Sequence, residues 1–213
     1  MLVVQLGGSP KHGATGKGTI ALAFTSLFAI TLVTVHIIEP ETNLGPVSLY
    51  SLGSFGFIMR AGFVVLGLAF FSIVAGLRGR ARATTLYSAD LIMLSIAGAG
   101  LVIVGAFNTD AMGTPSTLSG LIHSTAANVW SISAIVGILL FAIAFRQDGK
   151  RIAIGRISRN LGIATMITYL AGFLGLGAVQ PRLFFALVVL WLSLVANQLR
   201  IGKLTKLAVL EAS

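Results

Sequence analysis

Six long apolar runs, separated by short polar intervals, dominate the chain. A helix needs roughly 20 apolar residues to cross the hydrocarbon core of a bilayer, and each run is close to that length. The pattern therefore predicts an all-α integral membrane bundle of six transmembrane helices, at residues 19–38, 55–77, 86–107, 121–145, 161–179 and 183–199. Residues 19–199 form one domain in this interpretation, with tails at 1–18 and 200–213.

The composition agrees with a membrane protein. Hydrophobic residues make up 56% of the chain and charged residues only 10%, whereas a soluble domain carries about 25% charged residues. The 25 glycines suit a helical bundle in lipid, because small residues let helices approach closely. The absence of cysteine excludes disulfides, thiolate metal sites and cysteine nucleophiles.

The distribution of basic residues predicts the orientation. Of the 15 lysines and arginines, all but Arg60 and Arg182 fall in the tails or in the loops on the same side as the tails. Cytoplasmic loops collect basic residues, so we expect both tails in the cytoplasm. The net charge of +9 then reflects topology and contacts with anionic lipid headgroups, and we expect no nucleic-acid partner.

The most polar interval in the middle of the chain, FNTDAMGTPSTLSGLIHSTAAN at 107–128, lies on the predicted outer side. An arginine inside a membrane helix is costly unless it finds a partner. We therefore expect a connected outer cluster of Arg60, Asp110 and His123, with two further acids of the first outer loop, Glu39 and Glu41, beside it. These five residues are the candidate ligand-binding or lipid-binding site.

Three chemical alternatives use the same region. His36 and His123 with Glu39 and Asp110 provide a ligand set for a zinc-like metal, and the two histidines could instead clamp a haem. A hydrolytic site would combine Asp110 and His123 with a hydroxyl; the nearby hydroxyls are Ser116, Thr117, Ser119 and Ser124. The simpler interpretation is that each histidine hydrogen-bonds to a neighbouring carboxylate or carbonyl. We expect no cofactor.

Other polar residues have structural interpretations. Asp90 is expected to offset Arg78 or Arg82, and four more residues are expected to make interhelical hydrogen bonds: Asn128, Tyr169, Asn197 and Gln198. The segment from Thr42, with Gly45 and Pro46, partly repeats the segment from Thr109, with Gly113 and Pro115. The first two helices are thus a candidate distant repeat of the next two.

The motifs EPETNLGPVSLYSLG and FNTDAMG, followed by His123, resemble a bacterial six-helix membrane family, domain of unknown function 998. That family is similar in outline to Sfk-type and autophagy-modulator membrane proteins. Its motif is nearer to Phe-Pro-x-Asp followed by His; Phe107, Asp110 and His123 match, and Asn108 stands in place of the proline. The resemblance implies a six-helix bundle with an outward polar cluster, in the bacterial inner membrane, and no established reaction.

The sequence contains few residue patterns that are typical of catalytic sites. This favours a non-catalytic protein that binds lipid, a partner subunit or a second copy of itself. Small-residue helix faces, such as Ser95 with Ala99 and Ala171 with Gly175, would support such contacts. The alternative is an outer-face enzyme, hydrolytic or metal-dependent, that uses Asp110 and His123. A further alternative is a bis-histidine haem protein.

Overall fold

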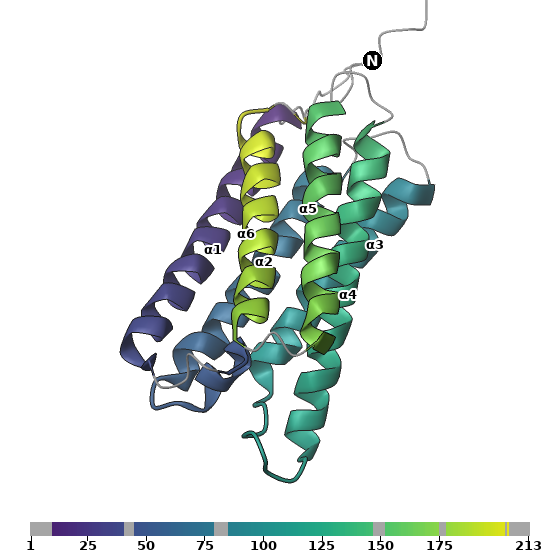
Figure 1. Ribbon diagram of the computed structural model, residues 1–213. Coiled ribbons are helices and arrows are strands. Elements are labelled where there is room, and N and C mark those ends of the chain that lie inside the picture. Colours follow the sequence, from purple (N-terminus) through teal and green to yellow (C-terminus); the bar gives the residue numbers. More distant parts are fainter. Residues whose placement is uncertain are drawn as a thin grey trace, which may run out of the picture.

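The computed structural model describes residues 10–40, 45–78, 85–146, 152–174, 178–202 and 204. Within them the chain forms an all-α bundle (Figure 1). Its six α-helices are α1 (Pro10–Ile38), α2 (Gly56–Leu77), α3 (Thr85–Ala106), α4 (Leu118–Arg146), α5 (Ile152–Ala171) and α6 (Val179–Arg200). Two short 3-10 helices, η2 (Val47–Leu52) and η3 (Gly172–Leu174), precede α2 and follow α5.

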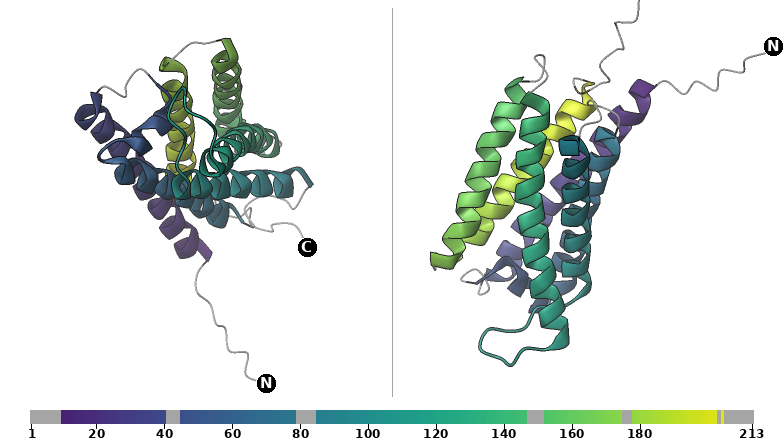
Figure 2. Two further views of the ribbon diagram at one scale, coloured as in Figure 1. Left: turned by 90° about the horizontal axis from the view of Figure 1, so that it is seen from below. Right: turned by 90° about the vertical axis from the view of Figure 1, so that its right-hand side faces the viewer.

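Consecutive helices pack side by side, and α6 returns to pack against α1, so the bundle closes on itself (Figures 1 and 2). We call the end that holds η2, the 107–117 segment and the start of α6 the distal end. The proximal end holds the start of α1 and the end of α6 (Figure 1). The distal end carries every candidate site residue that the structure describes.

Five of the helices are long and apolar enough to cross a membrane: α1, α2, α3, α4 and α6. The protein is therefore a multi-pass membrane protein. The fifth predicted span, 161–179, is shifted in the structure, because α5 begins at Ile152 and ends at Ala171. Its first half includes Arg156 and Arg159, which were expected in a loop, and α5 is not among the five candidate spans.

The other helix boundaries differ from the predictions by a few residues, except at the start. There α1 begins at Pro10, inside the segment expected to be a tail. Proline is well suited to a first helical position, because its missing N–H has no partner in the helix in any case.

Aromatic residues and glycines hold the helices together. Phe28 of α1, Phe63 of α2 and Phe185 of α6 meet with ring centroids 5.4–6.5 Å apart. Where α2 crosses α3, a Cβ added to Gly67 would lie 2.7 Å from the carbonyl oxygen of Gly98. No larger residue fits there without moving the backbone, so this contact requires glycine.

Candidate functional site

The distal end of α3 is capped by side chains from both neighbouring helices. Arg60 of α2 donates from Nε to the carbonyl of Gly105 and from an Nη to the carbonyl of Ala106, each at 3.0 Å. Nδ1 of His123, on α4, lies 3.1 Å from the carbonyl oxygen of Val104 and 2.8 Å from that of Phe107. The last carbonyls of a helix have no partner within it, and here four successive ones receive donors from these two residues.

The cap determines which nitrogen of His123 carries the proton. A carbonyl oxygen only accepts hydrogen bonds, so Nδ1 must be a donor in both contacts. In the neutral ring Nε2 is then an acceptor, and His123 makes no other hydrogen bond among the described residues. The ring is 2% exposed.

The expected ion pair between Arg60 and Asp110 is not found in the described part of the chain. Arg60 is satisfied by the carbonyls of α3, and the carboxylate of Asp110 instead accepts from the hydroxyl of Thr117 at 2.7 Å and from its backbone N–H at 3.0 Å. The hydroxyl oxygen of Thr117 in turn accepts from the N–H of Gly120, which caps the start of α4. The hydrogen bonds from Thr117, and secondarily the nearby His123, lower the pKa of Asp110 from its ordinary value of 3.8.

Glu39 has the same role in the first distal loop. Its Oε1 accepts from the backbone N–H of Phe55, the residue that caps α2, at 2.7 Å. In both loops an acid from the end of one helix thus lies at the start of the next, where the helix dipole favours negative charge. Each carboxylate also lies against a glycine, because a Cβ added to Gly53 or to Gly120 would come within 1.9 Å of it. Glu41 lies outside the described residues.

A second polar cluster joins α1, η2 and α6 around Arg182. Its Nε donates to Nε2 of His36 at 2.7 Å, and one Nη donates to the carbonyls of Gly45 at 3.0 Å and Ala178 at 2.5 Å. Its other Nη lies 3.3 Å from the hydroxyl of Tyr50. Nδ1 of His36 is 2.6 Å from the carbonyl oxygen of Leu32. Arg60 and Arg182, the two basic residues predicted to lie on the side opposite the tails, therefore both tie helices together at the distal end.

These contacts bear on the metal and haem alternatives. The described residues contain no group of three or more histidines, aspartates and glutamates that could hold a metal ion, so His36, Glu39, Asp110 and His123 are not brought together as a ligand set. Both ring nitrogens of His36 are engaged, Nδ1 with Leu32 and Nε2 with Arg182. A haem clamp by His36 and His123 would have to break the contact with Arg182.

A cavity of about 410 Å³ opens in the distal half of the bundle, bounded by η2 and by α2 to α6. Its walls include five aromatic side chains, Phe63, Trp130, Tyr169, Phe184 and Phe185. Trp130 stacks on Phe185 with ring centroids 5.2 Å apart and meets Phe184 edge-on at the same distance. Ligand sites are typically concave and lined by apolar and aromatic side chains with a few polar groups, at volumes of about 300–1,000 Å³.

The polar side chains of this cavity include no aspartate, glutamate, lysine or arginine; they are Ser48, His123, Asn128, Ser131, Tyr169 and Gln180. Tyr169 donates to the side-chain carbonyl of Asn128 at 2.9 Å, so both residues make an interhelical hydrogen bond, as was expected of each. Asn197 instead accepts from Arg200 within α6. Of the four described residues of the proposed outer site, His123 lines this cavity, and Arg60, Glu39 and Asp110 do not.

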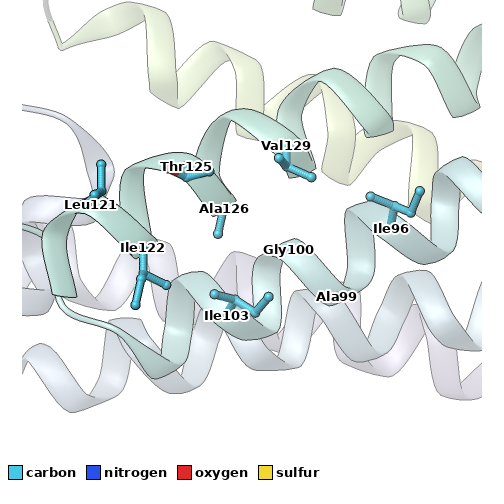
Figure 3. A pocket seen from close by; sticks show the side chains of 9 residues that line it. All are labelled: Ile96, Ala99, Gly100, Ile103, Leu121, Ile122, Thr125, Ala126 and Val129. Carbon is cyan, nitrogen blue, oxygen red and sulfur yellow. The ribbon is translucent and has the colours of Figure 1, made fainter. Parts of the chain in front are cut away.

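A separate apolar groove of about 510 Å³ lies between α3 and α4 (Figure 3). Figure 3 shows Ile103 and Ile122 facing the space between the two helices, and Ala99 and Gly100 contribute little or no side chain to it. Ala99 belongs to one of the predicted small-residue faces; the other includes Gly175, outside the described residues. Both helices that line this groove are long and apolar enough to cross a membrane.

Asp90 is fully buried on α3, toward the proximal end. Neither of its carboxylate oxygens has a hydrogen-bond partner among the described residues. The expected partner Arg78 makes no ion pair with it there, and Arg82 is outside the described part. A buried carboxylate in a membrane helix marks a functional position by default, but no described cavity includes Asp90.

Sequence reasoning missed Arg182, Tyr50 and Gln180. Arg182 had a usable signal, because it was one of two basic residues on the predicted outer side. Tyr50 and Gln180 gave none, since their roles depend on which helices become neighbours.

The sequence matches the profile of the family described as Protein of unknown function (DUF998) over residues 20–198. The match confirms the resemblance drawn from the two loop motifs and His123, and it covers five-sixths of the chain. Searches of curated proteins and of solved structures found nothing that matches this chain.

Proposed function

The chain belongs to the DUF998 family of membrane proteins, and we propose that this member binds a small amphipathic molecule in its distal cavity without transforming it. One observation carries the proposal: a cavity of about 410 Å³ has aromatic walls and a few neutral polar groups at one end of a membrane bundle. Such a site suits a molecule that partitions into the bilayer and presents one polar group. Membrane lipids and isoprenoids are the natural source of such molecules.

The hydroxyls near His123 support binding over hydrolysis. Thr117 donates to Asp110, Ser119 donates to the carbonyl of Asn108, and Ser124 donates to the carbonyl of Leu121. A nucleophilic hydroxyl needs a base within hydrogen-bond reach. Among the described residues no serine or threonine hydroxyl is hydrogen-bonded to the His123 ring. The contact between nucleophile and base that a hydrolytic site at Asp110 and His123 would need is therefore not found among them.

We further propose that α5 crosses the membrane with the other five helices and that the proximal end faces the cytoplasm of a bacterial cell. Supporting this, α5 runs beside α4 along the bundle (Figure 1), and its Arg156 and Arg159 lie toward the proximal end, where basic residues are favoured. Reporter fusions after Arg82 and after Gly113 should report opposite sides, the first cytoplasmic. Fusions that report the same side would refute this topology.

Binding can be followed through Trp130, which lines the cavity. The chain has two tryptophans, so a Trp191→Phe background leaves Trp130 as the only indole reporter. Titration of the purified protein in detergent with farnesol, a simple isoprenoid alcohol, should change the Trp130 fluorescence saturably. Ala127→Phe fills the cavity and should abolish the response, whereas Ala99→Phe fills the α3–α4 groove and should leave it unchanged. An unsaturable response, or equal loss in both variants, would overturn the proposal.

A further inference from the structure

Resting on the proposed function, we propose that the ligand is a neutral molecule with a free hydroxyl, which donates to Nε2 of His123 and accepts from the amide of Gln180. The ligand class is thus an isoprenoid-like or lipid-like alcohol. The proposal excludes two other classes of molecule from the cavity: charged lipids and fully apolar molecules.

His123 provides an acceptor because its other nitrogen is already committed. Nδ1 donates to the carbonyls at the end of α3, at 2.8 and 3.1 Å. Since the ring lines the cavity while Nδ1 is turned to α3, we infer that the edge carrying Nε2 is the one presented to a ligand. A neutral imidazole with its proton on Nδ1 accepts at Nε2, so the matching ligand group carries an O–H or N–H.

Gln180 is also uncommitted, as is the hydroxyl of Ser48 among the described residues, and of the two only Gln180 is an amide. Its amide lies against Gly172 of η3, where an added Cβ would be 3.0–3.2 Å from the amide atoms. It makes no hydrogen bond within the described structure, and it offers both a donor and an acceptor. Asn128 and Tyr169 are different, because they bond to each other and Asn128 also donates to the carbonyl of Ser124.

The absence of charge in the cavity walls selects against ionic headgroups. None of the described residues that line the cavity is an aspartate, glutamate, lysine or arginine. The two distal arginines are held elsewhere, Arg60 on α3 and Arg182 on His36 and its neighbours. A phosphate or an ammonium would therefore enter an aromatic cavity with no counter-charge, and burying an unpaired charge is strongly unfavourable.

The test compares farnesol with farnesyl methyl ether, which has the same chain but no donor, by titrating Trp130 fluorescence in the Trp191→Phe protein. Losing the donor leaves Nε2 unsatisfied, so the ether should bind about tenfold more weakly. His123→Asn keeps an amide N–H near the position of Nδ1 for the α3 cap and removes the acceptor, so it should erase the difference between the two probes. Gln180→Met should weaken farnesol binding severalfold without touching the cap. His36→Asn is the matched control, a histidine outside the cavity, and should leave the tenfold preference intact.

Equal affinity for farnesol and its ether would overturn the hydroxyl assignment while the cavity remained a binding site. Tighter binding of farnesyl phosphate than of farnesol would overturn the neutral class in the same way. If neither the alcohol nor the ether gave a response that Ala127→Phe removes, the proposed function itself would fail. Should His123→Asn not fold, the farnesol affinity of the Gln180→Met protein decides the matter, since a normal affinity there contradicts the proposal.

Discussion

Replacing Arg60 with methionine should lower the free energy of unfolding by about 2 kcal/mol, because two carbonyls at the end of α3 lose their donors. Methionine keeps most of the length and apolar contact of the side chain without its N–H groups. The carbonyls of Gly105 and Ala106, which Arg60 now reaches at 3.0 Å, would then depend on water at a half-buried helix end.

The magnitude follows from the two bonds. A hydrogen bond that involves a charged group contributes about 1.5–3 kcal/mol net, so two would give roughly 3–6 kcal/mol if both were fully buried. Arg60 is only partly buried. Water can replace part of each bond, and the variant also avoids the cost of holding a charge near hydrocarbon. Both effects bring the expected loss down to about 2 kcal/mol.

Reversible unfolding in mixed detergent and dodecyl sulfate micelles, followed by far-UV circular dichroism, measures this quantity. Arg159→Met is the matched control, because Arg159 is exposed on α5 and bonds only to the adjacent Asn160. The control should stay within about 0.5 kcal/mol of the parent protein. Arg60→Lys should fall between, since an ammonium cannot reproduce two bonds in the fixed geometry of a guanidinium.

A double variant with Asp110→Asn separates this account from the ion pair expected from the sequence. The structure gives Arg60 and Asp110 different partners, so their effects should add to within about 0.5 kcal/mol. A coupling clearly larger than that would restore the ion pair. An Arg60→Met protein as stable as the Arg159→Met control would refute the cap.

Two further predictions concern the distal acids. Thr117→Val should raise the pKa of Asp110 back toward 3.8, because the hydroxyl hydrogen bond is the largest cause of its lowering. Because its pKa is lowered, the Asp110 carboxylate stabilises the fold above pH 3.8, and this contribution is lost as the pH falls through the folded-state pKa. A carboxyl ¹³C titration by NMR measures the pKa of Asp110 in the parent and in the Thr117→Val protein. Identical titration curves for the two proteins would contradict the prediction. Gly53→Ala should cost about 1 kcal/mol, a typical value for a lost helix cap, because the new Cβ would displace the Glu39 carboxylate from the start of α2. Gly16→Ala is the control, because a Cβ at Gly16 would meet open space. The thermal stability of this variant should equal or exceed that of the parent. Equal losses in Gly53→Ala and Gly16→Ala would argue against the Glu39 cap of α2.

Much of the fold was predictable because crossing a membrane is a local property of a chain segment. Length and hydropathy alone placed α2, α3 and α4 within three residues of their observed ends. The exception, α5, has Arg156 and Arg159 inside the helix, where the sequence suggested a loop. Arginine has a high helix propensity, so these two residues do not stop a helix, and composition could not show where α5 begins.

The sequence also determined which polar residues gather at the distal end, since topology assigns each loop to one side. It could not determine their partners. Arg60 was expected to seek a carboxylate, yet it meets backbone carbonyls, which every helix end offers and no side-chain pattern reveals. Arg182 and His36 are 146 residues apart and meet only because α6 packs on α1.

The cavity belongs entirely to the tertiary structure. His123, Tyr169 and Gln180 come from α4, α5 and α6 and have no shared spacing that would connect them in the sequence. The availability of His123 as an acceptor is a consequence of where α3 ends, because the free carbonyls there hold the proton on Nδ1. Sequence could place the histidine near the membrane surface; only the packing of α4 against the end of α3 decided which of its nitrogens is left for a ligand.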